Sequence, residues 1–348
     1  MNAERFDDLI VFDGAAAKPE AVAVQIARSR DGTAIDGYRF GNGPRRVSLL
    51  AGCHADEPVG PRLLRALVSY LATLPSDDPL LHNYDWWIVP DINPDGARRN
   101  AAWQRPTAAS YDIADYLSHV IRELPGDDIE FGFPRHRDDV AARPENLGVY
   151  QWWCSDPTPV QLHATLHGMM RGAGPWFLLE EGWAERSLPL QQQLSASVAE
   201  QGYQLHDVER HGEKGFQRIS RGFCTRPDSR AMAQHFLALG DPATAALFRP
   251  SSMEAVRTLG GDPLTMVSEM PLFVTPGVGV DLGPPDVVAD SWKARFDSWR
   301  QQLLTGTDPV RVRRAAGEAG LQAMPVRDQM RLQWQLVVSG LALVSEVA

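Results

Sequence analysis

Apolar positions in the first hundred residues follow two different periods. Two stretches alternate apolar and polar residues and are joined by Asp31-Gly32, which is typical of a β-hairpin. Two later stretches are continuously apolar, as in buried strands, and the segment 61–74 between them has its leucines at helical spacing. We therefore expect strands at 21–27, 33–40, 47–51 and 84–89. This succession of strands and helices predicts an α/β fold in which helices cover a central sheet.

The same alternation continues through the middle of the chain. We expect helices at 111–123, 190–202 and 228–240. We expect strands at 159–168, 175–179 and 265–270, the last of them closed by Pro271. The segment 124–145 is rich in charged residues and proline, which predicts a loop.

From Asp290 onward the pattern is mostly helical. The segment 276–286, which is rich in glycine and proline, precedes this part and is a candidate linker. We therefore predict a main domain at 1–275 and a helical C-terminal extension at 276–348 packed on it. The predicted fold class is α/β, with a mixed central sheet flanked by helices and this extra helical segment.

Composition and charge narrow the possible partners. The 348 residues include 34 Lys and Arg against 44 Asp and Glu, a formal net charge of −10, which argues against a nucleic-acid partner. No run of about 18 apolar residues occurs, so we expect no membrane span. The first nine residues carry three acids and do not resemble a signal peptide. Three cysteines without metal-type spacing favour a reducing compartment, so we expect a cytoplasmic protein of unknown oligomeric state.

The most informative segment is 51–58, in which His54 and Glu57 directly follow a predicted buried strand. In open α/β sheets, ligands bind at the carboxyl ends of the strands. An imidazole nitrogen and a carboxylate oxygen there could bind Zn²⁺, which in catalytic sites takes three protein ligands and leaves a position for water. We therefore predict His54 and Glu57 as ligands, the alternative being a turn with a capping carboxylate. Cys53 is expected to be a small buried residue, because a further thiolate ligand would close the site.

The third ligand must also stand at a strand end. His167 meets this condition, since it ends a predicted strand next to Gly168. His163 is the competitor, because it lies four residues earlier and would face the same side of an extended strand. We prefer His167 because of its position at the strand exit.

Two further segments add possible chemistry. A turn, Asn93-Pro-Asp-Gly96, leaves a predicted strand and is followed by Arg98, Arg99 and Asn100. An arginine beside a metal can stabilise an oxyanion. Glu269 lies in an apolar strand, where a carboxylate is costly to bury unless it is paired or functional. Near a metal it would serve as general base and then pass the proton to the leaving amine.

These four motifs, in this order, resemble the zinc carboxypeptidase family of peptidases over about residues 20 to 275. That family has a strand ending in Gly-x-His-x-x-Glu, then Asn-Pro-Asp-Gly, then Leu-His-Gly, and much later a strand carrying Glu. The resemblance implies that one zinc ion is bound by His54, Glu57 and His167. It also implies that Glu269 is the catalytic carboxylate and Arg98 the oxyanion arginine, with Arg99 as the alternative.

One segment departs from the family. The family segment Asp-Leu-Asn-Arg-Asn-Phe-Pro holds the substrate's terminal carboxylate with its Asn-Arg pair, but the best match here, 128–134, has Glu130 and Phe131 in those places. Glutamate and phenylalanine cannot clamp an anion, so either Arg135 or Arg137 does so or the substrate has no carboxylate there. Our hypothesis is that Glu130 instead recognises a cationic or amide group. The other expected substrate-binding residues are Arg99, Asn100 and Arg135, and no substrate-capping tyrosine can be placed.

Together, these observations predict a zinc metallopeptidase of the carboxypeptidase type that cleaves a peptide or small amide by metal-activated water. A first alternative is an N-acyl amino acid deacylase that resembles the succinylglutamate desuccinylase and aspartoacylase branch. A second alternative is a non-catalytic zinc-binding relative. Asp128 could orient a ligating histidine as a hydrogen-bond acceptor.

Overall fold

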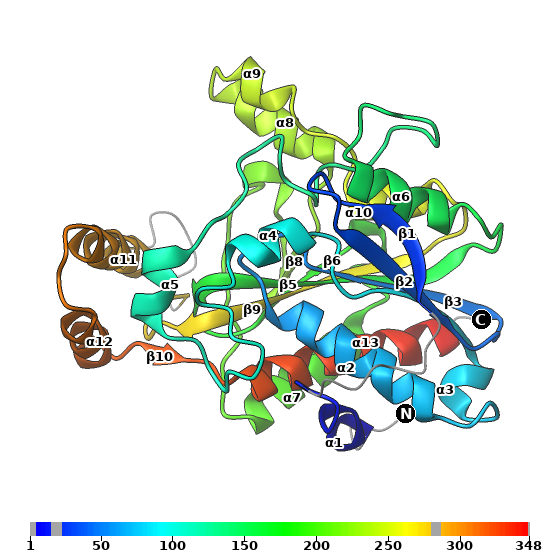
Figure 1. Ribbon diagram of the computed structural model, residues 1–348, viewed down its shortest axis with the longest axis horizontal. Coiled ribbons are helices and arrows are strands. Elements are labelled where there is room, and N and C mark those ends of the chain that lie inside the picture. Colours follow the sequence, from blue (N-terminus) through cyan, green and yellow to red (C-terminus); the bar gives the residue numbers. More distant parts are fainter. Residues whose placement is uncertain (1–4, 15–22, 280–286, 347–348) are drawn as a thin grey trace.

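The computed structural model describes residues 5–14, 23–279 and 287–346. Within these residues, one mixed sheet has the order β1-β2-β4-β3-β5-β9-β6-β8-β7, and β10 pairs with β9 (Figure 1). The strands are β1 (Val24–Arg28), β2 (Ala34–Phe40), β3 (Arg45–Ala51), β4 (Tyr84–Val89), β5 (Val160–Gly172), β6 (Trp176–Leu179), β7 (Arg218–Ser220), β8 (Phe223–Thr225), β9 (Leu264–Val274) and β10 (Gln322–Ala323). The predicted class, α/β with a mixed sheet flanked by helices, is confirmed.

Helices surround this sheet and also form the C-terminal part of the chain. They are α1 (Arg5–Ile10), α2 (Val59–Thr73), α3 (Pro79–His82), α4 (Pro94–Arg99), α5 (Ile113–His119), α6 (Pro144–Trp153), α7 (Leu188–Glu200), α8 (Ser229–Ala238), α9 (Pro242–Ala245), α10 (Ser252–Arg257), α11 (Val287–Leu304), α12 (Pro309–Glu318) and α13 (Val326–Glu346). Two short 3₁₀ helices are η1 (Glu181–Trp183) and η2 (Glu213–Gly215). Among the described helices, none is both long and apolar enough to cross a membrane.

Four adjacent parallel strands, in the order β4-β3-β5-β9, form the centre of the sheet. Their apolar runs have no polar alternation because both faces of the sheet are covered, and all six residues of β4 are buried. Helices α2, α7 and α13 lie on one face, while α6 and α10 lie on the other (Figure 1). The strands β3, β5 and β9 therefore run toward the same edge of the sheet, and β5 and β9 continue past the end of β3.

Three elements end about four residues away from the predicted position. Strand β5 runs on to Gly172, so His167 lies inside the strand and the prediction that it stands at the strand exit was wrong. Strand β9 runs through Pro271 to Val274, so the prediction that Pro271 closes it was wrong. The proline is tolerated because β9 pairs with β6 only up to Glu269, and at Pro271 it is in register only with Met169 of β5 on the other side. Helix α5 is shorter than predicted, since the backbone at Val120 is already extended.

Two other predictions are only partly covered by the described residues. The first predicted strand, 21–27, begins outside them and continues as β1. Most of the predicted linker, 280–286, also lies outside them.

The C-terminal helix α13 is part of the main apolar core. It packs against α2, α7, β5 and β9, and most of its residues are buried. At Gly340 the helix approaches the sheet so closely that an added Cβ would lie 2.4 Å from the Met266 side chain. The domain boundary predicted at residue 275 stays a prediction. If the chain is divided there, α13 still packs on the sheet of the first part.

We expect Leu341→Ala on α13 to destabilise the protein by about 2–5 kcal/mol, because Leu341 is fully buried and its truncation leaves a cavity. The matched control is Leu304→Ala at the end of α11, where the side chain is 64% exposed and a change below about 0.5 kcal/mol is expected. Urea unfolding at fixed metal content measures both. Equal effects of the two substitutions would contradict the core position of α13.

Candidate metal centre

The end of β3 turns sharply to present two polar side chains. Gly52 has a positive φ of 78°, and a Cβ there would lie 2.7 Å from the Asp91 carboxylate, so the position favours glycine. The Glu57 amide then donates to the His54 carbonyl, which closes a short turn before α2 begins. This turn brings His54 and Glu57 to the same side of the chain.

The neighbouring strands deliver two more side chains to the same edge. Ala51 of β3 is in register with Leu166 of β5, so His167 stands one residue beyond the end of β3. On the other side of β5, His167 is in register with Glu269 of β9. The parallel register therefore places both predicted residues beside the β3 turn, although they are far apart in sequence.

The three predicted ligands converge. Glu57 Oε1 lies 2.7 Å from His54 Nδ1, Glu57 Oε2 lies 2.9 Å from His167 Nδ1, and the two Nδ1 atoms are 3.2 Å apart. One donor atom from each of the three residues lies within 4.8 Å of the others. Glu57 and His167 are buried and His54 is 14% exposed, which leaves one side of the group accessible.

The electrostatics of this group favour positive charge at its centre. Burial alone would raise the pKa of Glu57, but the two histidines hold it well below its usual value. Burial also opposes protonation of His167, yet Glu57 and Glu130 raise its pKa to about 9. The pKa of His54 is raised in the same way, by Glu57 and Asp128. Two imidazoles that hold protons this strongly around a carboxylate form a donor set that suits a divalent cation, which would replace those protons.

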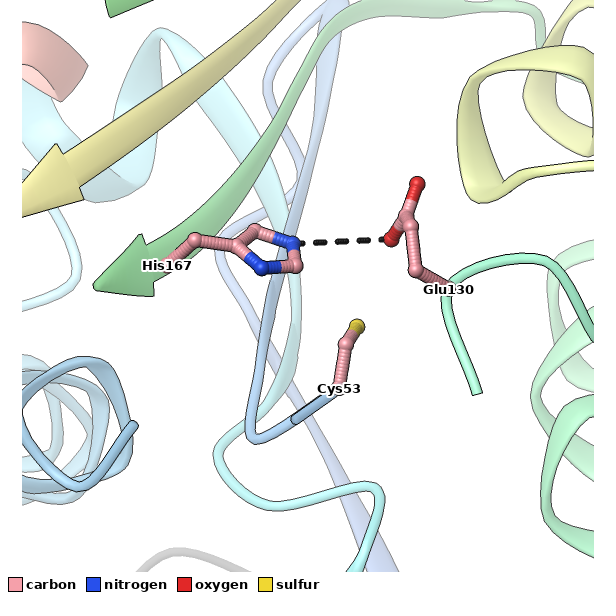
Figure 2. Close-up of side chains that lie close together, drawn as sticks. All are labelled: Cys53, Glu130 and His167. Carbon is pink, nitrogen blue, oxygen red and sulfur yellow. Dashed lines mark ion pairs between the residues drawn. The ribbon is translucent and has the colours of Figure 1, made fainter. Parts of the chain in front are cut away.

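A second group of possible ligands shares one histidine with the first. Cys53, Glu130 and His167 also offer atoms within 4.8 Å, and Figure 2 shows Glu130 facing the His167 ring with Cys53 beside them. Burial and the neighbouring Glu130 carboxylate raise the pKa of the Cys53 thiol well above its usual value, which disfavours a thiolate ligand. Glu130 is already paired at 2.7 Å with Arg226 Nη2. The first group therefore fits a cation better than the second.

Two carboxylates hold the outer nitrogens of the histidines. Asp128 Oδ1 lies 3.4 Å from His54 Nε2, and Glu130 Oε2 lies 3.5 Å from His167 Nε2. Carboxylates in this position fix the ring orientation of metal-ligating histidines. The hypothesis that Glu130 recognises a cationic substrate group gains no support, because this carboxylate is occupied within the protein.

His163, the competitor for the third ligand, points elsewhere. Its two nitrogens each lie 3.1 Å from a serine hydroxyl, of Ser48 and Ser252, and the ring is fully buried. Burial lowers its pKa to about 3. It therefore remains a neutral core residue away from the three converging donors.

The structure does not bring the predicted arginines to the donors. The Arg98 guanidinium binds Asp31 and Asp95 on the surface, and Arg99 is exposed. Asn100 is fully buried, and its amide binds main-chain groups of Gly96 and Ile121. Four predicted residues are not among the side chains that line the cavity beside the donors: Arg98, Arg99, Asn100 and Arg135.

A different arginine stands at the site. Arg122 Nη1 lies 3.2 Å from Glu57 Oε1 and 3.0 Å from Asp56 Oδ1. The negative charge of Glu269 also raises the pKa of Arg122. Sequence reasoning missed it because it follows α5, 26 residues after Gly96. The segment that carries it is tied back to Asn100, whose amide donates to the Ile121 carbonyl, a contact that the sequence does not show.

Glu269 completes the site as a buried acid. Burial and the nearby charge of Glu57 raise its pKa to about 8, although both histidines and Arg122 act in the opposite direction. A cavity of about 410 Å³ opens beside it, and Glu269, His54, His167 and Arg122 all line this cavity. A carboxyl group poised near neutral pH in a cleft is suited to proton transfer.

The sequence profile of the zinc carboxypeptidase family matches residues 12–218, more than half of the chain. No curated protein matches the sequence. Among solved structures, the chain is similar to carboxypeptidase A from Helicoverpa armigera (13% identity, TM-score 0.49, covering 99% of this chain and 72% of that one). It is also similar to a metallo-carboxypeptidase from Burkholderia cenocepacia (14% identity, TM-score 0.45, covering 100% of this chain and 70% of that one). Bovine thrombin-activatable fibrinolysis inhibitor, solved in complex with tick carboxypeptidase inhibitor, shares the fold (11% identity, TM-score 0.52, covering 99% of this chain and 97% of that one).

The buried neutral His163 predicts a specific pH dependence of stability. An unfolded histidine takes up a proton below about pH 6.5, whereas folded His163 does so only near pH 3, so this residue lowers stability as the pH falls between those values. The cost is about 2 kcal/mol at pH 5. We expect the difference in free energy of unfolding between the parent and His163→Asn, measured by urea titration, to shift by about 2 kcal/mol in favour of the variant as the pH falls from 7 to 5. A constant difference would show that His163 is not held neutral.

Proposed function

The chain belongs to the zinc carboxypeptidase family, and we propose that it is a zinc-dependent hydrolase of the carboxypeptidase type that cleaves an amide bond. The observation that carries the proposal is the convergence of two imidazole nitrogens and a carboxylate beside a buried acid of raised pKa. The substrate would be a peptide or a small amide. The cytoplasmic location predicted from the cysteines stays a prediction.

In this proposal His54, Glu57 and His167 would hold one zinc ion. When bound, zinc would polarise the substrate carbonyl and lower the pKa of water. The three residues supply two nitrogens and one carboxylate, a ligand set that catalytic zinc sites use. Asp128 and Glu130 act as positioning residues, because they face the outer nitrogens of the two histidines.

Glu269 is the proposed general base and acid. Its pKa is raised to about 8 because the carboxyl group is buried near Glu57. A neighbouring divalent cation would lower this pKa toward its usual value. The carboxylate then accepts a proton from the attacking water and later donates it to the nitrogen of the leaving amine. Its register with His167 keeps it beside the ligand group during both transfers.

Arg122 is the proposed oxyanion arginine, in place of Arg98. It lines the cavity together with Glu269 and both histidines, whereas Arg98 is held on the surface by Asp31 and Asp95. A fixed guanidinium beside the reacting carbonyl stabilises the negative charge that develops on its oxygen. Asp56 and Glu57 hold Arg122 in this position.

The same residues would serve an N-acyl amino acid deacylase. Phe131 lines the cavity in the place where the resemblance leads us to expect an arginine, but both substrate classes carry a carboxylate next to the scissile nitrogen, so this residue does not separate them. A panel of N-acyl amino acids and peptides with free carboxyl ends distinguishes the two activities. Stoichiometric zinc with no hydrolysis of any panel member would favour a non-catalytic relative.

We expect Arg122→Gln to lower kcat by about 10²–10³ with little change in zinc content, because it removes charge stabilisation but no ligand. Arg98→Gln is the matched control and should leave kcat within about twofold. Steady-state kinetics on the best panel substrate measure both. Loss of activity in Arg98→Gln alone would return the role to the arginine predicted from sequence.

We expect Glu269→Gln to lower kcat by about 10²–10⁴ while the protein still binds one zinc ion, since glutamine cannot accept the proton.

His54→Ala should lose both zinc and hydrolysis, because only two of the three proposed protein ligands remain. Elemental analysis after gel filtration measures zinc, and circular dichroism controls for folding. A His54→Ala protein that keeps stoichiometric zinc would refute the ligand assignment.

A further inference from the structure

The cavity beside the candidate metal centre has a cationic wall. Five basic side chains line it, against three carboxylates, although the chain as a whole carries a charge of −10. The basic residues are Arg122, Arg171, Arg210, Lys214 and Arg226. A local excess of cations in a cleft attracts anionic ligands and raises their local concentration. The cavity chemistry therefore points to an acidic substrate.

Two of these cations have no carboxylate within ion-pair distance in the described part of the chain, Arg171 and Arg210. Arg210 lies over two aromatic rings, 4.7 Å from the Phe216 centroid and 5.4 Å from the Trp176 centroid. Arg171 lies 5.2 Å from the Phe296 centroid. Aromatic rings position a guanidinium without neutralising it, so both charges remain available to a ligand.

Both cations line the same cavity as Glu269. Trp176 of β6 is in register with Glu269, and the Arg210 guanidinium lies over the Trp176 ring. Arg171 is four residues beyond His167 on β5, which is about 13 Å farther along the same strand face. A substrate whose amide lies at Glu269 would extend its neighbouring side chain along this wall.

Arg226 supplies a second, independent observation. Its side chain is 2% exposed and lines the cavity. Nη2 binds Glu130 and Ser252, whereas Nη1 is buried without a hydrogen-bond partner among the described residues. A buried charged donor without a hydrogen-bond partner destabilises the protein, because nothing replaces the hydration that it has lost. An anionic group of the substrate would satisfy it.

Building on the proposed amide hydrolysis, we propose that the substrate is an amide of an acidic amino acid, so that the released product carries two carboxylates. Arg226 binds the carboxylate next to the scissile nitrogen and takes the place that Phe131 cannot fill. Arg210 binds the side-chain carboxylate, and Arg171 adds long-range attraction. A peptide ending in glutamate and an N-acyl glutamate share this chemistry.

The test compares substrates that differ only in side-chain charge, with the zinc-loaded full chain. One pair is benzoylglycyl-glutamate and benzoylglycyl-glutamine, and the other is N-acetyl-glutamate and N-acetyl-glutamine. We expect kcat/KM to be at least about tenfold higher for the glutamate member of the pair that is cleaved. Cleavage of the first pair indicates a peptidase, and cleavage of the second a deacylase. Equal rates within the cleaved pair would overturn the proposal.

The variant Arg210→Gln should abolish the glutamate preference, so that kcat/KM for the glutamate member falls about tenfold relative to that for the glutamine member. Arg300→Gln is the control, because Arg300 is an exposed arginine on α11 that does not line the cavity. A glutamate preference that survives Arg210→Gln would contradict the assignment of this residue.

Binding is measured separately so that the two proposals can fail independently. Calorimetry compares glutarate, which has two carboxylates, with butyrate, which has one. Glutarate binding that Arg210→Gln weakens by about tenfold supports the acidic pocket, and if no amide is hydrolysed in that case, only the proposed function fails. Equal binding of glutarate and butyrate would overturn the acidic pocket whatever the activity.

Discussion

A single buried carboxylate organises the candidate site. Glu57 lies within 3.2 Å of two imidazole nitrogens and a guanidinium nitrogen, and these cations keep it ionised despite its burial. Removing a carboxylate from water is costly unless such partners compensate. The same negative charge raises the pKa of both histidines and of Glu269. A divalent cation in this position would neutralise the charge of Glu57. The pKa of Glu269 would then fall, so that this carboxyl group would release its proton more readily.

The sheet topology makes this convergence possible. Three parallel strands lie in the order β3-β5-β9, and their register fixes which residues stand side by side where β3 ends. His54 and Glu57 follow β3, His167 lies on β5 and Glu269 on β9. His167 and Glu269 are thereby held side by side by main-chain hydrogen bonds of the sheet, and the turn after β3 holds His54 and Glu57 beside them, as catalytic geometry requires.

Much of this arrangement could be predicted from the sequence, because buried strands are continuous apolar runs and the polar residues directly after them fall at the active edge. The strand 84–89 was predicted with its observed bounds. The arginine could not be predicted, because Arg122 reaches the site through an irregular segment whose path depends on the Asn100 side chain. The cationic wall was equally hidden, since Arg171, Arg210 and Arg226 come from three separate elements without a shared motif.

The most direct measurement is zinc K-edge X-ray absorption on the stoichiometrically loaded protein. We predict nitrogen and oxygen ligands at about 2.0–2.2 Å and no sulfur, as His54, Glu57 and His167 would provide. A zinc–sulfur distance of about 2.3 Å would contradict this prediction, because that signal would place the ion with Cys53, Glu130 and His167 instead.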